Sequence, residues 1–258
     1  MLLFLAESKT MSGTQMGVDP KYYHEHCPVF EKMADTLMER IESLTIGDLS
    51  QILGISNQLA IKAHSLAYDF PHKLTGYKAL DGFIGEAYRG LDVKTMSTES
   101  ISRANDTLRI ISSVYGLLRP NDIIKPYRCE FNKPIGVDNV TPIKLFKSKI
   151  TIELVNHIKS NKINEIIDLL PGDADKCIDW KIVRAFASVQ KICFQSISPE
   201  GKLKTPIAKR LKELRGIMAR TILMEGISTF KDLTTFKSEH FIYSEHDSKP
   251  GLPILIAE

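Results

Sequence analysis

The stretch Val114-Tyr-Gly-Leu-Leu-Arg-Pro-Asn-Asp-Ile-Ile-Lys-Pro-Tyr-Arg128 combines two prolines, a glycine and two tyrosines with three cations, Arg119, Lys125 and Arg128. Proline fixes φ and glycine permits conformations closed to other residues, so turns of this kind hold the backbone still. Cations on such a backbone can be held at the geometry that a phosphate or a carboxylate needs. The alternative is a corner between two strands that carries ordinary surface cations.

Four blocks in order along the chain resemble the peroxide stress protein YaaA family. They are Lys9-Thr10 after an apolar run, Phe83-Ile-Gly85-Glu-Ala-Tyr88-Arg-Gly90-Leu91, Tyr115-Gly116-Leu-Leu-Arg119-Pro120 with Lys125-Pro126-Tyr127-Arg128, and Arg215-Gly216-Ile-Met218-Ala-Arg220. Together the blocks span nearly all of the 258 residues. The resemblance implies a part in the response to hydrogen peroxide, a form of oxidative stress, and an association with low free intracellular iron.

The chain departs from the family at two places. The family usually has Ser-Pro-Ala-Lys-Thr where this chain has Ala6-Glu7-Ser8-Lys9-Thr10, so only Lys9 and Thr10 carry over. The family tends to have Asn-Leu-Ala-Ser where this chain has Asp168-Leu-Leu-Pro171, followed by Gly172-Asp173-Ala174. The chain therefore resembles a divergent member, and no role is carried over to the second segment.

Length and composition are those of a well-buried globular protein. With 258 residues, 43% hydrophobic and 25% charged, the chain is large enough for one domain over residues 1–258. Apolar periodicity predicts helices and strands that alternate, which favours an α/β fold with a mixed sheet wrapped by helices. The expected strands are residues 2–6, 110–118, 166–170 and 189–197, and the expected helices are residues 29–44, 97–108 and 143–158.

The formal net charge of +3 is too small for a domain-wide basic field, but the cations cluster between Lys202 and Arg220. Thr205-Pro206 is typical of a helix start, and apolar residues of the following helix share one face, opposite Lys209, Lys212 and Arg220. A cationic stripe of this kind is often only a solvated face. Arg215 lies near the apolar boundary beside Gly216, a helix-interior glycine that often marks the close approach of a backbone or a ligand.

Residues 45–66 resemble a helix-hairpin-helix element, with a turn at Gly54-Ile55-Ser56. In that motif the backbone N–H groups at a helix N-terminus accept a DNA phosphate without reading the base sequence. Ser56 is suited to cap the second helix, and Lys62 to contact the DNA backbone. A plain pair of antiparallel helices is the alternative.

The sequence contains no framework for a metal or a standard cofactor. The four cysteines have no Cys-x-x-Cys spacing, and the group His24-Glu25-His26-Cys27 is best explained as a surface turn. No Walker loop, dinucleotide fingerprint, nucleophile elbow or HExxH is present. We expect a cytoplasmic protein with no cofactor, no metal ion and no membrane segment.

We interpret the chain as a protein that binds DNA, including distorted or damaged duplex, without sequence specificity through a positively charged cleft. The alternative is an enzyme that acts on a nucleotide or another phosphorylated small molecule in the same cleft, with Asp173 or Glu130 as proton-transfer groups. Tyr88 and Tyr115 are candidates for stacking on bases, or else core residues with bonded hydroxyls. The phosphate-binding candidates are Lys9, Thr10, Gly54, Ser56, Lys62, Arg119, Lys125, Tyr127, Arg128, Lys209, Lys212, Arg215 and Arg220.

Overall fold

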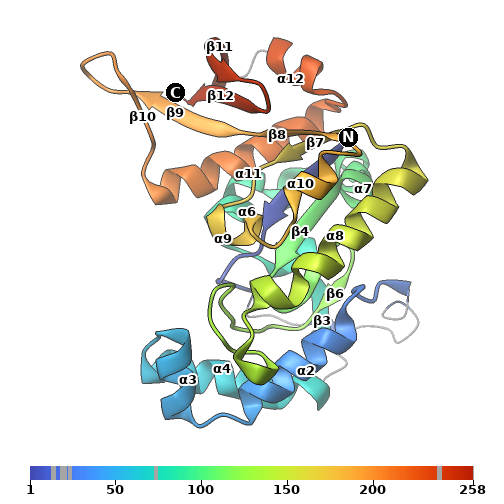
Figure 1. Cartoon of the computed structure of the whole chain (residues 1–258), viewed down its shortest axis with the longest axis vertical. Helices are drawn as coiled ribbons and strands as arrows, with labels where there is room; N and C mark the ends of the chain where they lie inside the picture. Colours follow the sequence, from blue (N-terminus) through green and yellow to red (C-terminus); the bar gives the residue numbers. More distant parts are fainter. Residues whose placement is uncertain (13–15, 18–21, 23–24, 73–74, 237–239, 258) are drawn as a thin grey trace.

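A five-stranded sheet organises the computed structural model, which describes residues 1–12, 16–17, 22, 25–72, 75–236 and 240–257 (Figure 1). In spatial order its strands are β5 (Gly116–Leu118), β4 (Leu108–Ser112), β1 (Leu2–Ala6), β7 (Glu165–Asp168) and β8 (Ser188–Lys191). Strands β4, β1, β7 and β8 run parallel to one another, and β5 pairs with β4 in the antiparallel direction. The carboxyl ends of four neighbouring strands therefore lie along one edge of the sheet.

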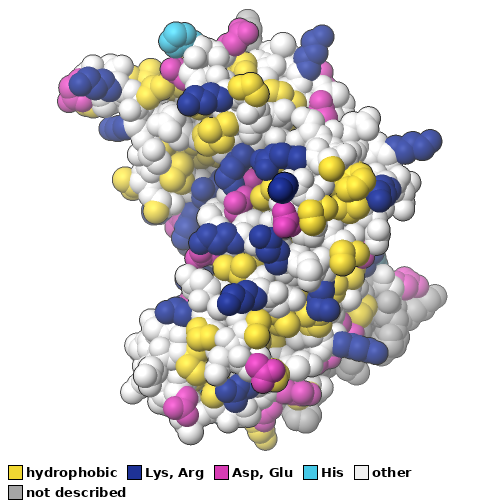
Figure 2. Space-filling model, in the orientation of Figure 1, with side chains coloured by type: hydrophobic (Ala, Val, Ile, Leu, Met, Phe, Trp, Pro, Cys, Tyr) yellow, Lys and Arg dark blue, Asp and Glu magenta, His cyan; other side chains and the backbone are white. Residues whose placement is uncertain are grey.

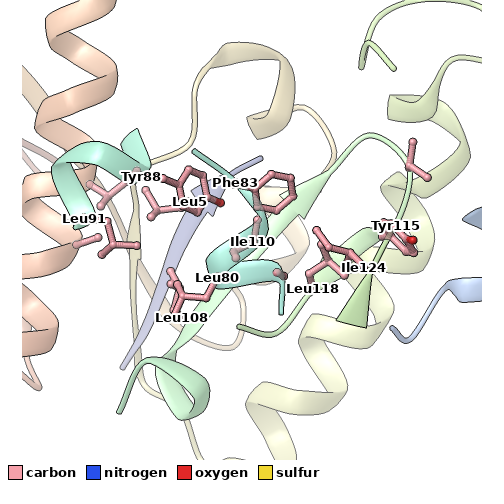
Figure 3. Close-up of a cluster of buried hydrophobic side chains, with 14 of the residues drawn as sticks. Leu5, Leu80, Phe83, Tyr88, Leu91, Leu108, Ile110, Tyr115, Leu118 and Ile124 are labelled. Atoms are coloured by element: carbon pink, nitrogen blue, oxygen red, sulfur yellow. The ribbon is translucent and has the colours of Figure 1, made fainter. Parts of the chain in front are cut away.

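Strand β1 is buried on both faces because its side chains alternate between two separate cores. Leu2 and Phe4 belong to one core, and Leu3 and Leu5 belong to the other. Helices that supply residues to the Leu2 core are α8 (Pro142–Asn161), α9 (Gly172–Asp175) and α10 (Trp180–Val183). Among the helices that supply residues to the Leu3 core are α6 (Glu86–Leu91), α7 (Thr98–Thr107) and α11 (Ala208–Glu225). Figure 3 shows part of the second core, where Tyr88 of α6 lies beside Leu5 of β1.

Two smaller sheets extend the structure. One has the order β10 (Leu203–Lys204), β9 (Cys193–Ile197), β12 (Leu252–Ala257), β11 (Phe241–Lys249), and the other has the order β2 (Met16–Gly17), β3 (Thr75–Lys78), β6 (Ile123–Ile124). The remaining short elements are η1 (Phe70–His72), α5 (Ala79–Gly82), η2 (Val93–Thr95), η3 (Val137–Asn139) and α12 (Phe230–Thr235).

Three helices form the part of the molecule drawn at the bottom of Figure 1, namely α2 (Glu31–Glu42), α3 (Ile46–Leu53) and α4 (Asn57–Asp69). Helix α3 ends at Gly54, whose φ of 66° is a left-handed conformation that glycine adopts without strain. Helix α4 begins after Ser56, whose hydroxyl accepts the N–H of Leu59 at 3.3 Å. The expected pair of helices is thus present, while its assignment as a DNA-binding helix-hairpin-helix element stays a prediction.

Helices α6 and α11 cross in close contact because each contributes a glycine. A Cβ atom on Gly216 would lie 1.7 Å from the carbonyl oxygen of Ala87, and one on Gly90 would lie 2.4 Å from the carbonyl oxygen of Glu213. No side chain fits at either point, so the backbones can approach. Gly216 therefore marks the approach of another backbone, which is one of the two explanations expected for a helix-interior glycine.

The structure corrects three boundaries. The single strand expected over residues 110–118 is two strands, β4 and β5, because the chain reverses before Gly116, whose φ is 67°. The single strand expected over residues 189–197 passes from one sheet to another at Ile192. Helix α11 begins at Ala208 rather than at Thr205-Pro206, because Lys204 still pairs with Ser196 in an extended strand.

The predicted α/β class with a mixed sheet is confirmed. One domain over residues 1–258 stays a prediction. No helix in the described ranges combines the length and the apolar character needed to cross a lipid bilayer.

We expect Gly216→Ala to lower the free energy of unfolding by at least about 2 kcal/mol, since the new methyl group would overlap the Ala87 carbonyl. Urea denaturation of the purified variant measures this loss. Gly172→Ala is the matched control, because a Cβ at Gly172 has no neighbour within 4 Å, and its change should stay within about 0.5 kcal/mol. Equal losses in the two variants would contradict the tight crossing.

Candidate functional site

A pocket with a volume of about 550 Å³ lies at the carboxyl end of β1. We call it the central pocket. Five segments line it, namely Leu5–Thr10, the start of α6 with Arg89, Glu130–Phe131, Pro171–Ala174, and Lys212 with Arg215 on α11. Figure 2 shows Lys and Arg side chains gathered across the middle of one face of the molecule, between the part with α11 and the part with α3 and α4.

The central pocket occupies the position where an open α/β sheet most often binds a ligand. Helices α6 and α7, which lie between β1 and β4 in the chain, pack on one face of the sheet, while α9 and α10, which follow β7, pack on the other. Since β1 and β7 are neighbours, their following segments part at this point and leave a crevice. Such a crevice, outside the carboxyl ends of the strands, is the common ligand site of doubly wound sheets.

The cations of the pocket differ in how they are paired. Lys9 forms a close ion pair with Glu130, and Arg89 pairs with Glu86 at 3.0 Å. Lys212 and Arg215 also line the pocket. Within the described residues, neither has an ion pair or a hydrogen bond. These two side chains lie one turn apart on α11, so they can face the same bound group.

Arg215 is the less solvated of the two unpaired cations. It is half-buried, and burial lowers the pKa of its guanidinium, an effect that Asp168 and the Cys193 thiol oppose. A cation that has lost part of its water and has no counter-ion gains more from a bound anion than a cation in bulk water does. The prediction that Arg215 would lie in a cleft agrees with this position.

Glu7 directly follows β1 and lines the pocket. Its carboxyl group has no cation partner in the described part of the chain. Its Oε2 atom accepts the backbone N–H of Ser113 at 2.9 Å and the hydroxyl of Tyr127 in a short hydrogen bond. Burial raises the pKa of the Glu7 carboxyl, although its hydrogen bonds with Ser113 and Tyr127 act in the opposite direction. Desolvation therefore favours the neutral acid.

A cluster of hydrogen-bonded side chains lies at the end of β7. The ammonium group of Lys191 donates to Asp168 at 2.9 Å and to Asp175 at 2.6 Å, and the Trp180 indole donates to Asp175 at 2.9 Å. Burial raises the pKa of Asp168, which the charge of Lys191 opposes. This cluster ties β7, β8 and α9 together beside the pocket.

Four of the predicted phosphate contacts meet in the central pocket, together with both predicted proton-transfer candidates. These residues are Lys9, Thr10, Lys212 and Arg215, with Glu130 and Asp173. Asp173 accepts from Lys176 at 3.0 Å and from the Asn132 amide at 3.2 Å.

The cations of the quoted 114–128 stretch do not line this pocket. Arg119 pairs with the buried Asp122 at 2.8 Å, and Lys125 donates to the carbonyl of Phe70 at 2.7 Å. Tyr127 is buried against Glu7, and Arg128 approaches Glu130 at 3.8 Å. The alternative of a corner between two strands therefore describes the backbone better, because β5 and β6 flank the turn at Arg119.

Two cations of α11 contact α6 and are not part of the pocket lining. Arg220 donates to the carbonyl groups of Leu91 at 3.1 Å and Asp92 at 2.9 Å, where α6 ends. Lys209 lies 4.0 Å from Glu86 and is mostly exposed. Arg220 thus satisfies carbonyl groups that a helix leaves free at its end.

The candidates in the α3–α4 turn lie outside the pocket but are connected to it. Gly54, Ser56 and Lys62 are exposed. Lys133 places its ammonium group 3.1 Å from the point that a Cβ on Gly54 would occupy. Because Glu130 lines the pocket, the segment from Glu130 to Lys133 runs from the pocket to the turn.

Tyr88 and Tyr115 are core residues rather than stacking surfaces. They are 5% and 2% exposed. The Tyr88 hydroxyl donates to the carbonyl of Ala6 at 3.2 Å, and the Tyr115 hydroxyl accepts the N–H of Lys125 at 3.0 Å. The alternative of core tyrosines with bonded hydroxyls therefore fits both rings.

Within the described ranges, no group of three or more His, Cys, Asp or Glu side chains is placed to hold a metal ion. His24 of the group His24-Glu25-His26-Cys27 lies outside the described residues. The Cys27 thiol lies 2.7 Å from the carboxylate of Glu31, and all four cysteines are free thiols.

Glu7, Arg89 and Lys191 were not expected at the site. A polar residue directly after a buried strand is a usable signal, because the carboxyl ends of parallel strands meet at one edge. Glu7 carries that signal after β1, as does Asp168 at the end of β7. No spacing in the sequence distinguishes Arg89 or Lys191 from other surface cations.

Comparison with known proteins identifies similar chains along the whole length. The family model described as "Peroxide stress protein YaaA" matches residues 1–247. A UPF0246 protein of Shewanella pealeana is 28% identical over 264 residues, which cover 100% of this chain and 99% of its own length. UPF0246 proteins of Shewanella sediminis and of Clostridium perfringens strain SM101 are each 30% identical, over 90% and 96% of both chains, respectively.

We expect Glu7→Gln to become progressively more stable than the natural protein as the pH rises from 5 to 8. The folded state holds the Glu7 proton more tightly than the unfolded state, whose pKa is near the ordinary 4.5, so the stability of the natural protein falls as the pH rises above that value. Glutamine has no proton to lose, so the variant lacks this decline. Urea unfolding at several pH values measures the difference.

Glu225→Gln, at the exposed end of α11, is the matched control and should follow the natural protein in parallel at every pH. A Glu7→Gln curve that also stays parallel would show that Glu7 has an ordinary pKa.

Proposed function

The chain belongs to the peroxide stress protein YaaA family, and from that premise we propose that it serves the response to peroxide in the cytoplasm by binding DNA without sequence specificity. The proposed contact surface extends from the central pocket, along Glu130 to Lys133, to the α3–α4 turn. Nicked, gapped or otherwise distorted duplexes are the preferred partners in this proposal, because they bend into a concave surface at lower cost.

The observation that carries the proposal is the presence of unpaired cations at the pocket and of a second phosphate-compatible element nearby. Lys212 and Arg215 have no acidic partner in the described residues, so they are available to neutralise phosphates. The exposed start of α4 offers backbone N–H groups, and Lys133 stands beside the turn. Each neutralised phosphate releases counter-ions, which supplies affinity for any base sequence.

In this proposal the affinity for DNA depends more on the local arrangement of cations than on the total charge of the chain. A net charge of +3 gives little attraction at long range, and two pocket cations, Lys9 and Arg89, are held by acids. Binding should therefore depend strongly on a few side chains. Thr10, Gly54, Ser56 and Lys62 remain proposed contacts at the edges of this surface.

We propose that any effect on free iron is an indirect consequence of this role. No group of three or more His, Cys, Asp or Glu side chains in the described residues is placed to bind iron. In this view the protein acts on DNA, and the change in available iron follows from the state of the cell.

A second candidate function is an activity on a nucleotide or another phosphorylated small molecule in the central pocket. The observation that favours it is the position of a 550 Å³ cavity outside the carboxyl ends of parallel strands, with Glu130 and Asp173 in its lining. A duplex is too wide to enter such a cavity, whereas a mononucleotide matches its size.

We expect Arg215→Ala and Lys212→Ala each to reduce the salt dependence of DNA binding by about one unit of slope, in the plot of log affinity against log salt concentration, for every duplex tested. Each variant removes one phosphate contact. Fluorescence anisotropy with nicked, gapped and intact duplexes at several salt concentrations measures the slope.

Lys149→Ala is the matched control, since Lys149 is an exposed cation on α8, which packs on the opposite face of the sheet. Its slope should equal that of the natural protein. Binding that responds equally to all three substitutions, or no binding at low salt, would overturn the DNA proposal.

A further inference from the structure

We propose that the central pocket holds the phosphate group of a small molecule, and that Glu7, as a neutral carboxylic acid, donates a hydrogen bond to that group while Lys212 and Arg215 supply its counter-charge. This inference deepens the second candidate function above and rests on it. An ionised carboxylate would repel a bound anion, so the neutral state of Glu7 explains how a carboxyl group can belong to an anion site.

The hydrogen bonds around Tyr127 have only one direction. The hydroxyl oxygen of Ser112 accepts the N–H groups of Val114 at 3.2 Å and of Tyr115 at 3.0 Å, so its own proton is free for donation. Ser112 therefore donates to the Tyr127 oxygen at 2.7 Å, and Tyr127 donates to Glu7. The backbone beyond β4 thus fixes the orientation of the phenol.

This direction determines where the proton of Glu7 resides. The Oε2 atom of Glu7 accepts from both Tyr127 and the Ser113 N–H, so it has no place for a proton. The acid proton must reside on the other oxygen, Oε1. Glu7, which lines the pocket, therefore has one oxygen that already accepts two hydrogen bonds and one O–H group that can donate.

The surroundings of Glu7 favour the neutral acid. Its carboxyl has no cation within ion-pair distance in the described residues, and desolvation penalises its charged form. A carboxylic acid kept neutral by its site is a known way to hold a donor against a negative group. The titratable and charged groups that face it from the packed elements are Lys9 on its own segment, Tyr127, Cys129 and Glu130 on the segment after β6, Glu86, Tyr88 and Arg89 on α6, Asp173 on α9, Cys177 directly after α9, and Lys212 and Arg215 on α11.

Helix α11 supplies the charge that an anion requires. Lys212 and Arg215 stand one turn apart on α11 and are both unpaired in the described part of the chain. Their positions are fixed by the glycine crossing of α6 and α11. Two cations and one neutral donor suit a dianion such as a phosphate ester, because each of its oxygens can then receive a donor.

The test uses sulfate as the probe, because sulfate keeps two negative charges between pH 6 and 9, whereas inorganic phosphate changes charge in that interval. Isothermal titration calorimetry of the full chain with sulfate at pH 6 and pH 9 measures affinity. We expect the natural protein to bind sulfate at least tenfold more weakly at pH 9, because ionised Glu7 loses its donor and repels the anion. Lysine and arginine keep their charge in this range.

Two variants separate the parts of the inference. Glu7→Gln should bind sulfate with the same affinity at pH 6 and pH 9, since its amide oxygen takes both donors and its amide nitrogen replaces the protonated oxygen. Lys212→Ala should weaken binding at both pH values and keep the dependence on pH. Lys149→Ala should leave the affinity unchanged.

The other possible results contradict either the anion site in the central pocket or the role of Glu7. Sulfate binding that Lys212→Ala does not alter would remove the anion from the central pocket. Binding that requires Lys212 but is equally strong at pH 6 and 9 would overturn the role of Glu7 and leave the pocket as an anion site. No sulfate binding at any pH would overturn both. The DNA proposal is tested independently, by the salt dependence of DNA binding described above.

Discussion

The contact between the backbones of α6 and α11 sets the width of the central pocket. Gly90 and Gly216 leave no side chain between the two helices, so α11 lies as near to α6 as the two backbones permit. Arg215 directly precedes Gly216, and its side chain is thereby brought to the end of β1. A wider crossing would move both unpaired cations away from Glu7. The packing of two helices thus decides which groups can share a ligand.

The apolar pattern identified the main helices and β1 correctly, because each helix has a buried face with a regular spacing and β1 is a continuous apolar run. It did not show where a strand changes partners. No glycine or proline interrupts residues 189–197, although hydrogen bonding passes from one sheet to another at Ile192. It also did not show that the chain reverses before Gly116. Both features depend on neighbours that are distant in the sequence.

The site was predictable to a similar extent. Lys9 and Arg215 were identified from family blocks, and Lys212 from a helical stripe, and all three line the pocket. Arg119 and Lys125 were misplaced because their partners could not be inferred, one being the buried carboxylate of Asp122 and the other a backbone carbonyl 55 residues earlier in the chain. Glu7 was not selected, because its place directly after β1 was the one available signal and no spacing to a second residue supported it. Its environment, rather than its sequence, makes it unusual.

The passage of β8 into β9 has a consequence for how this chain can vary. Lys191, which bridges Asp168 and Asp175 beside the pocket, is separated from β9 by Ile192 alone. Most connections between sheets are loops that tolerate insertions, because an added residue changes only an exposed turn. Here an insertion or a deletion would shift Lys191 out of register with Asp168 or shift β9 against β12. We expect sequence length to be constrained at this junction and free to change in the β9–β10 turn, where Gly201 has open space around it.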